Sequence, residues 1–160
     1  MIALYLSLGS NLGDRRANLE NALKRLDVAL RPADSTRSSV IETEAWGFDG
    51  GPFLNMAVRL AIPRTHQSPE AQALDILKVI KSIEEDMGRR ENVVYDSSGR
   101  RIYHSRPIDI DILFFGAHTV DLPSLKIPHP LISERDFVKV PLREIAKPAL
   151  KKAFSALFIN

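Results

Sequence analysis

The chain has 160 residues, of which 44% are hydrophobic and 26% charged; these values are ordinary for a globular protein and exclude a disordered or fibrous chain. Its 22 basic and 20 acidic residues almost balance, so the net charge makes no strong case for nonspecific binding to nucleic acid or to a membrane surface. The absence of cysteine excludes disulfides, thiolate metal sites and cysteine nucleophiles.

The first 62 residues alternate between the sequence patterns of strands and of a helix. Leucines at helical spacing predict an amphipathic helix over residues 15–30, with Asp14 as its N-cap. Gly9-Ser10-Asn11-Leu12-Gly13 is typical of a turn, and residues 44–52 of a glycine-rich loop. Alternating or β-branched residues predict strands at residues 2–8, 36–43 and 53–62.

The second part of the chain begins with another helix signal. Ser68-Pro69-Glu70 has the order of an N-cap, an N1 proline and an acidic first turn. The residues expected on the apolar stripe of this helix are Leu74, Leu77, Ile80, Ile83 and Met87. Further along, the patterns predict a hairpin around residues 96–99, an alternating strand over 107–115, a short helix opened by a Ser133–Asp136 capping box, and a helix near 149–158.

The order of these elements is β-α-β-β-α-hairpin-β-α. Two consecutive strands between two helices indicate an α+β sandwich of the split-βαβ, ferredoxin-like kind, with an antiparallel sheet and an added hairpin and C-terminal helices. A doubly wound fold would need a helix between most strands. We expect a single domain over residues 1–160.

Two acidic residues, Asp109 and Asp111, interrupt the apolar strand near residue 110. Because side chains alternate between the two faces of a strand, both carboxylates share one face, roughly 6.5–7 Å apart, while Ile108, Ile110, Ile112 and Phe114 share the other. A hard divalent cation would relieve their repulsion, and Mg²⁺ binds through one or two carboxylates plus substrate phosphates. On its own, however, a D-x-D motif is more often a strand with two solvated aspartates.

The segment before this strand is rich in arginine. It contains Arg89, Arg90, Arg100, Arg101 and Arg106, opposed by Glu91 and Asp96. Carboxylates for a metal beside arginines for phosphates form the electrostatic pattern of a nucleoside triphosphate site, and a solvated basic hairpin is the alternative. Arg106 has the opposite strand parity from Asp109, so it can reach this carboxylate only if the backbone turns near Pro107.

Other candidates have an ordinary structural interpretation as well. Phe53, Asn55 and Phe137 combine flat apolar surfaces with an amide and could enclose a heteroaromatic ring, although phenylalanines are more often core residues. Glu84 lies one turn after Lys81, which suggests an ion pair on the helix surface.

Taken together, these features resemble the 6-hydroxymethyl-7,8-dihydropterin pyrophosphokinase family of folate biosynthesis, from residue 2 to residue 148. The motifs that carry the resemblance are Gly9-Ser10-Asn11-Leu12-Gly13, Glu42-Thr43-Glu44-Ala45-Trp46-Gly47, Phe53-Leu54-Asn55, Ile83-Glu84, Gly88-Arg89, Arg106-Pro107-Ile108-Asp109-Ile110-Asp111-Ile112-Leu113, Pro128-His129-Pro130 and Arg135-Asp136-Phe137. The resemblance implies a ferredoxin-like fold and ATP-dependent transfer of a pyrophosphoryl group to the hydroxymethyl group of a reduced pterin, with release of AMP.

The resemblance also implies roles for individual residues. Asp109 and Asp111 would hold two Mg²⁺ ions, with Arg106 as a third catalytic residue. The residues implied for the pterin are Thr43, Glu44, Ala45, Trp46, Phe53, Asn55 and Phe137. Those implied for ATP are Lys81, Glu84, Arg89, Tyr103, Arg106, Ile112, His129, Pro130 and Arg135. We expect a cytoplasmic monomer that acts on these two small molecules and binds neither nucleic acid nor membrane.

The arginine-rich segment departs from the family pattern. Glu91 stands where a second arginine is frequent, Tyr103 where tryptophan is common, and Ser105 where proline often precedes Arg106. Which arginine of this segment replaces the one expected at position 91 is left open.

Two alternatives come from other classes of protein. The arginine-rich hairpin suits a nucleic-acid-binding ferredoxin-like module, but no aromatic RNA-binding motif is visible and the charge is balanced. A sugar-nucleotide transferase also uses a D-x-D metal site, but the chain looks short for one and shows no doubly wound half.

Overall fold

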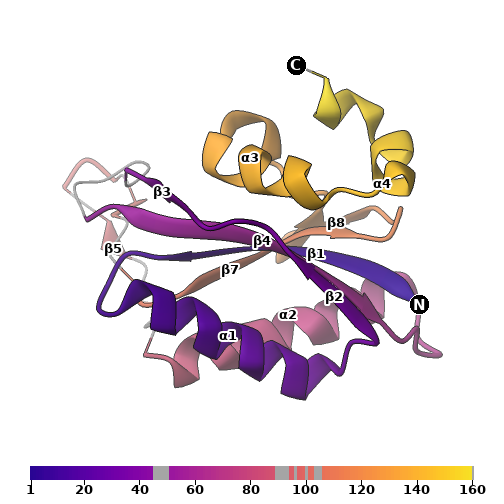
Figure 1. The fold of residues 1–160 in the computed structure, drawn as a ribbon, viewed down its shortest axis with the longest axis horizontal. Helices are drawn as coiled ribbons and strands as arrows, with labels where there is room; N and C mark the ends of the chain where they lie inside the picture. The colour runs from indigo at the N-terminus through magenta and orange to yellow at the C-terminus, as the bar shows by residue number, and fades with distance from the viewer. Residues whose placement is uncertain (45–50, 89–93, 96, 100, 103–105, 160) are drawn as a thin grey trace.

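An antiparallel sheet separates two layers of helices in the computed structural model (Figure 1). The structure describes residues 1–44, 51–88, 94, 95, 97–99, 101, 102 and 106–159. Helices α1 (Arg15–Leu30) and α2 (Pro69–Asp86) cover one face of the sheet, and α3 (Asp136–Ile145) and α4 (Pro148–Ala153) cover the other. Among the described residues, no helix is long and apolar enough to cross a membrane.

The main sheet has the strand order β2-β4-β1-β7, and every neighbouring pair is antiparallel. The first strand and the strand that follows α1 are therefore separated by β4, which is the split βαβ arrangement. The predicted ferredoxin-like class is confirmed. The strands of this sheet are β1 (Ile2–Ser10), β2 (Asp34–Arg37), β4 (Phe53–Ile62) and β7 (Asp109–Phe115), and β3 (Ile41–Thr43) pairs with β4 beyond β2.

The two long helices begin where their capping residues predict. The backbone N–H of Ala17 donates to Asp14 Oδ1 at 3.1 Å, and that of Ala71 donates to Ser68 Oγ at 3.2 Å. Each bond satisfies an N–H that would otherwise lack a partner in the first turn. The predicted apolar stripe of α2 is confirmed: Ile80 and Ile83 are buried, and Leu74, Leu77 and Met87 are half-buried and pack against the hydrophobic core. The buried residues of the helix are Gln72, Ala73, Ile76, Ile80, Ile83 and Glu84.

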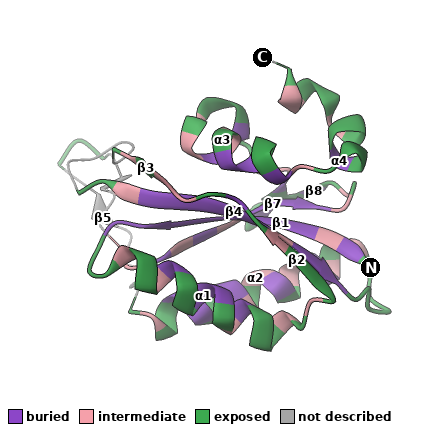
Figure 2. Cartoon of the chain, viewed as in Figure 1, coloured by how far each residue is buried: buried purple, intermediate pink, exposed green. Residues whose placement is uncertain are grey.

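Two hydrophobic clusters lie on opposite faces of the sheet (Figure 2). A β-bulge at Leu113 decides which residues of β7 belong to each, because the pairing with β1 shifts by one residue there. Leu113 and Phe114 both join the cluster under α3 and α4. The prediction that Phe114 shares a face with the isoleucines is therefore wrong; Ile108, Ile110 and Ile112 pack in the cluster under α1 and α2.

The predicted strand over residues 36–43 is two strands, β2 and β3, separated at Ser38. The backbone N–H of Ser38 donates to Ala57 O at 2.9 Å, while the N–H of Ala57 donates to Ser38 Oγ at 2.8 Å. A side-chain hydroxyl thus takes the place of a backbone carbonyl in the ladder, and the regular pairing is interrupted.

Two small hairpins complete the sheet structure. Strands β5 (Val94–Tyr95) and β6 (Arg101–Ile102) pair in antiparallel fashion, which confirms the hairpin predicted in the arginine-rich segment. Strands β8 (Val120–Leu122) and β9 (Leu125–Ile127) form a second hairpin that the sequence patterns missed. Three residues are too few to display a two-residue periodicity.

The predicted helix ends in the last third of the chain are partly wrong. Ser133 lies inside the 3₁₀ turn η1 (Ile132–Glu134), and Arg135 is the N-cap of α3 without a side-chain cap. The helix predicted near 149–158 is α4 followed by a separate 3₁₀ turn, η2 (Ser155–Phe158).

Candidate active site

A pocket opens on the α3 side of the sheet, where β1, β4 and β7 meet the start of α3. It encloses about 580 Å³ of empty space, open solvent at its mouth included. Its lining residues are Ser7, Gly9, Thr43, Glu44, Phe53, Asn55, Arg106, Asp109, Asp111, Arg135 and Phe137. The pocket thus gathers described residues predicted for the pterin, for catalysis and for ATP.

Gly9 forms part of the floor of this pocket. In the sheet it pairs with Asn55 of β4 on one side and with Asp109 of β7 on the other. A Cβ atom on Gly9 would lie 3.0 Å from Asn55 Oδ1 and 3.3 Å from Cδ1 of Phe53. The missing side chain therefore provides the space in which a flat ligand can approach the sheet.

The assignment of residues 9–13 to a turn is wrong at its start, because β1 continues through Ser10. Gly9 therefore belongs to the pocket, and so does Ser7, two residues before it on the same face. The sequence patterns identified neither residue as part of a site. The signal that could have found them is a pair of small residues at i and i+2 inside an otherwise apolar strand.

Asp109 and Asp111 point into the pocket from β7, as their alternation predicts. Arg106 Nη1 lies 3.4 Å from Asp109 Oδ1, and Arg135 Nη1 lies 3.8 Å from Asp111 Oδ2. Arg106 reaches Asp109 because β7 begins only at Asp109, so the backbone change expected near Pro107 occurs. Two arginine and two aspartate side chains in one pocket form a polar site suited to an anionic ligand with its counter-ions.

His129 stands beside these carboxylates, with Nε2 4.0 Å from Asp111 Oδ1. The backbone N–H of Leu131 donates to His129 Nδ1 at 3.1 Å, so the proton of the neutral ring is on Nε2. Burial lowers the pKa of the His129 imidazole, the charge of Arg135 lowers it further, and the charge of Asp109 opposes both.

This lowered pKa predicts a pH-dependent stability. Below about pH 6.5, the ordinary pKa of histidine, the unfolded chain binds a proton that folded His129 resists. The contribution of His129 to the free energy of unfolding is complete above about pH 6.5. It is lost as the pH falls toward the lowered pKa of His129 in the folded protein. We expect His129→Asn, whose amide oxygen can still accept the Leu131 N–H, to reduce the slope of unfolding free energy against pH in urea titrations with EDTA.

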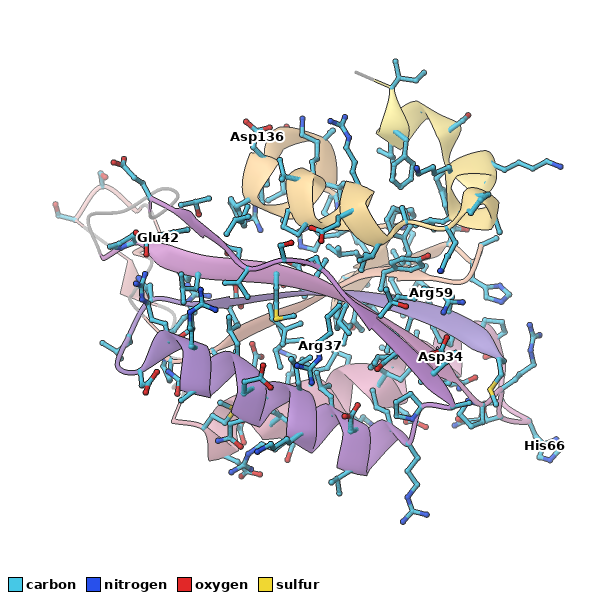
Figure 3. The ribbon with its side chains drawn as sticks, viewed as in Figure 1. Asp34, Arg37, Glu42, Arg59, His66 and Asp136 are labelled. Carbon is cyan, nitrogen blue, oxygen red and sulfur yellow. The ribbon has the colours of Figure 1, made fainter. Side chains whose placement is uncertain are left out.

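His66 provides the matched control, because it is an exposed histidine on the loop after β4 (Figure 3). His66→Asn should keep the wild-type slope. An unchanged slope in His129→Asn would contradict the prediction.

Asn11 joins segments that flank the pocket. It is 7% exposed; its N–H donates to Arg106 O at 3.2 Å, and its Oδ1 accepts the Arg106 N–H at 2.7 Å. Its Nδ2 donates to Gly51 O at 3.2 Å. The side chain therefore holds the backbone of Arg106 beside the segment that leads into β4.

Arg15 ties both sides of the predicted 44–52 loop to α1. Its Nη1 donates to Pro52 O at 2.9 Å and its Nη2 donates to Glu42 Oε2 at 2.8 Å. Glu42 lies on β3, at the end of the sheet nearest this loop (Figure 3). Thr43 follows it and accepts a 2.7 Å hydrogen bond from Asn55 Nδ2.

Several predicted ATP residues do not line the pocket. Lys81 is exposed on α2, Pro130 is exposed beside His129, and the Ile112 side chain is buried on the opposite face of the sheet. Glu84 is buried rather than on the helix surface. Four further predictions, for Ala45, Trp46, Arg89 and Tyr103, lie outside the described residues.

Comparisons with known proteins agree on one family. The family model described as 7,8-dihydro-6-hydroxymethylpterin-pyrophosphokinase (HPPK) matches residues 5–147. A 2-amino-4-hydroxy-6-hydroxymethyldihydropteridine pyrophosphokinase from Porphyromonas gingivalis is 43% identical, over 91% of this chain and 92% of that protein. A protein of the same name from Bacillus subtilis is 35% identical, over 95% of this chain and 83% of that protein.

A solved structure agrees in fold. The crystal structure of an HPPK-DHPS protein in complex with substrates superposes with a TM-score of 0.62 at 14% identity, covering 97% of this chain and 43% of that one. The family match spans the strands and the start of α3 that carry the pocket. This chain belongs to the 7,8-dihydro-6-hydroxymethylpterin-pyrophosphokinase family.

Proposed function

We propose that this protein catalyses the ATP-dependent transfer of a pyrophosphoryl group to 6-hydroxymethyl-7,8-dihydropterin, with release of AMP, in folate biosynthesis. It is a transferase of the HPPK family, with ATP as co-substrate. The observation that carries the proposal is one pocket lined by two aromatic rings, two carboxylates and two arginine side chains. We also propose a single-domain monomer over residues 1–160 that resides in the cytoplasm, a reducing compartment that suits a chain without cysteine.

The two phenylalanine rings that line the pocket suit a flat heterocycle. We infer that Phe53 and Phe137 bind the two faces of the pterin ring, since both line the pocket from different elements. Asn55 Nδ2 already donates to Thr43 Oγ1, and this bond orients the amide so that Oδ1 faces the pocket beside Gly9. An oriented carbonyl oxygen can accept a hydrogen bond from an N–H on the pterin edge.

The two aspartates that line the pocket suit a magnesium-bound triphosphate. The side chains of Asp109 and Asp111 are 28% and 32% exposed, so their hard oxygen atoms are accessible from the pocket. Among the residues that the structure describes, no three carboxylate or imidazole groups gather as a complete metal cage, and Mg²⁺ usually completes its shell with substrate phosphates and water. We propose that these two aspartates hold two Mg²⁺ ions, which when bound would offset the negative charge of the phosphates.

Apart from the ions, the proposed transfer reaction depends on side chains of this protein. The pterin hydroxyl attacks the β-phosphorus of ATP; the new O–P bond replaces the bond to the α-phosphate, AMP leaves, and the hydroxyl proton is released. Arg106, beside Asp109, and Arg135, beside Asp111, would offset the charge of the phosphates. His129 can donate from Nε2 to an anionic oxygen without changing its protonation state.

Arg106→Ala should slow the chemical step more than it weakens pterin binding. Its guanidinium lies 3.4 Å from Asp109 Oδ1, so its positive charge would act beside the phosphates, whose negative charge shifts during transfer. We expect single-turnover AMP formation to fall by about 10²–10³-fold, as for other groups that stabilise a developing anion. Arg106→Lys should recover part of the loss, because the charge returns without the planar geometry. An unchanged single-turnover rate in Arg106→Ala would count against this role.

The proposed function is tested by measuring AMP release with Mg²⁺, ATP and 6-hydroxymethyl-7,8-dihydropterin, beside a control without the pterin. We expect AMP and a pyrophosphorylated pterin in equal amounts, and neither product in the control. AMP without a modified pterin, or no AMP at all, would reject the proposal. The nucleic-acid-binding alternative receives no support from the comparisons; salt-sensitive RNA binding in the absence of turnover would revive it.

A further inference from the structure

The two aspartates lie on an edge strand of the sheet. Strand β7 is at the edge of the order β2-β4-β1-β7, so β1 pairs with it on one side only. The strand also begins at Asp109, and strand ends at a sheet edge open more readily than central strands. A site that depends on the directions of two side chains here needs a further restraint on the backbone.

That restraint comes from α2, on the opposite face of the sheet from the pocket. Glu84 Oε2 accepts the backbone N–H of Ile110 at 2.9 Å. Ile110 is the residue between Asp109 and Asp111, and its N–H belongs to the peptide unit that follows Asp109. Holding this peptide plane restricts the backbone dihedral angles of both flanking residues.

The burial of Glu84 marks this contact as a specific one. The residue is 4% exposed, and a buried carboxylate is costly unless it is hydrogen-bonded. Further along the same strand, the backbone N–H of His129 donates to Leu113 O at 3.1 Å. Of these two contacts to the β7 backbone from outside the sheet, the one from Glu84 lies nearer the two aspartates.

We propose that Glu84 is a positioning residue for pyrophosphoryl transfer: it acts through the backbone of Ile110 to fix Asp109 and Asp111, rather than by contacting ATP. This inference rests on the proposed function. The family resemblance implied a role in ATP binding for Glu84 instead; Glu84 does not line the described pocket, and the measurements below distinguish the two roles.

The experiment compares Glu84→Ala and Glu84→Gln with the wild type, and uses Glu85→Ala, at the exposed neighbouring position on α2, as the matched control. Amide hydrogen exchange at Ile110, measured without nucleotide or metal, reports the backbone restraint directly. Steady-state and single-turnover kinetics, together with calorimetric binding of a non-hydrolysable ATP analogue with and without Mg²⁺, report its consequence for the site.

We expect faster exchange at Ile110 in Glu84→Ala, and kcat lowered by about 10–100-fold, since small misplacements of catalytic groups have effects of this size. Binding of the analogue should weaken only in the presence of Mg²⁺. Glu84→Gln should restore protection and most of kcat, because its amide oxygen can accept the same hydrogen bond. Glu85→Ala should match the wild type in all three measurements.

The alternative outcomes are distinct. Unchanged exchange at Ile110 or an unchanged kcat in Glu84→Ala would overturn the inference, as would a raised KM for ATP with normal kcat in both Glu84 variants. If Glu84→Ala does not fold, Glu84→Gln decides: loss of protection at Ile110 or of activity in this nearly isosteric variant would overturn the inference. A wild type that releases no AMP would instead remove the proposed function, and this inference with it.

Discussion

Replacing Asp111 by asparagine should lower the rate of AMP release by at least about 10³-fold, because magnesium ions stabilise transferring phosphoryl groups by several kcal/mol. The substitution keeps the shape of the side chain and removes its charge. It also removes the negative partner of Arg135, which lies 3.8 Å away. Asp109→Asn should have an effect of similar size, since the two carboxylates share one face of β7. The measurement is single-turnover AMP formation at saturating substrates.

Asp136→Asn serves as the control for this pair. Asp136 is exposed at the start of α3 (Figure 3) and contacts Lys139 on the same helix at 3.4 Å. It carries the same chemical change next to the site without lining the pocket, so its turnover should remain near that of the wild type. Thermal unfolding should show that all three variants fold. Near-normal turnover in both Asp109→Asn and Asp111→Asn would refute the metal role.

Gly9→Ala is expected to weaken pterin binding by about 10–100-fold, because overpacking a filled site typically costs about 1–3 kcal/mol. The added Cβ would lie 3.0 Å from Asn55 Oδ1, which is tighter than most Cβ contacts in proteins. The Asn55 amide must then move, which disturbs its 2.7 Å hydrogen bond to Thr43. Fluorescence or calorimetric titration with the pterin measures the effect, and affinity for an ATP analogue should stay close to that of the wild type.

Gly51→Ala is the matched substitution. Among the residues that the structure describes, a Cβ on Gly51 would meet only Asn11 O, at an ordinary contact distance of 3.7 Å. This variant should bind the pterin like the wild type. Equal pterin affinity in Gly9→Ala and Gly51→Ala would show that the floor of the pocket is not where the ligand binds.

Much of the fold could be predicted because its signals are local. The N-caps Asp14 and Ser68 each satisfy an N–H group three residues away, so the starts of α1 and α2 can be recognised in the sequence alone. The alternation of β7 likewise predicted that Asp109 and Asp111 share a face, because strand parity depends only on position along the chain. The order of the elements then restricted the topology to a split βαβ sandwich.

Features that depend on partners distant in the sequence could not be predicted. The bulge at Leu113 exists only in the pairing of β7 with β1, and it moves Phe114 to the other face. Glu84 looks like a surface residue until the edge of β7 supplies a buried N–H donor. Gly9 looks like a turn residue until β4 and β7 flank it and make its missing side chain part of a pocket.

The sequence by itself therefore determined the class of fold, the family and the pair of carboxylates, since periodicity, capping and motif order are properties of the chain. Only the tertiary structure decided which small residue opens the pocket, which histidine nitrogen faces Asp111 and which buried carboxylate restrains β7. These depend on distances between segments up to about a hundred residues apart, as between Asn11 and Arg106. Such distances arise only when the sheet closes and the helices pack against it.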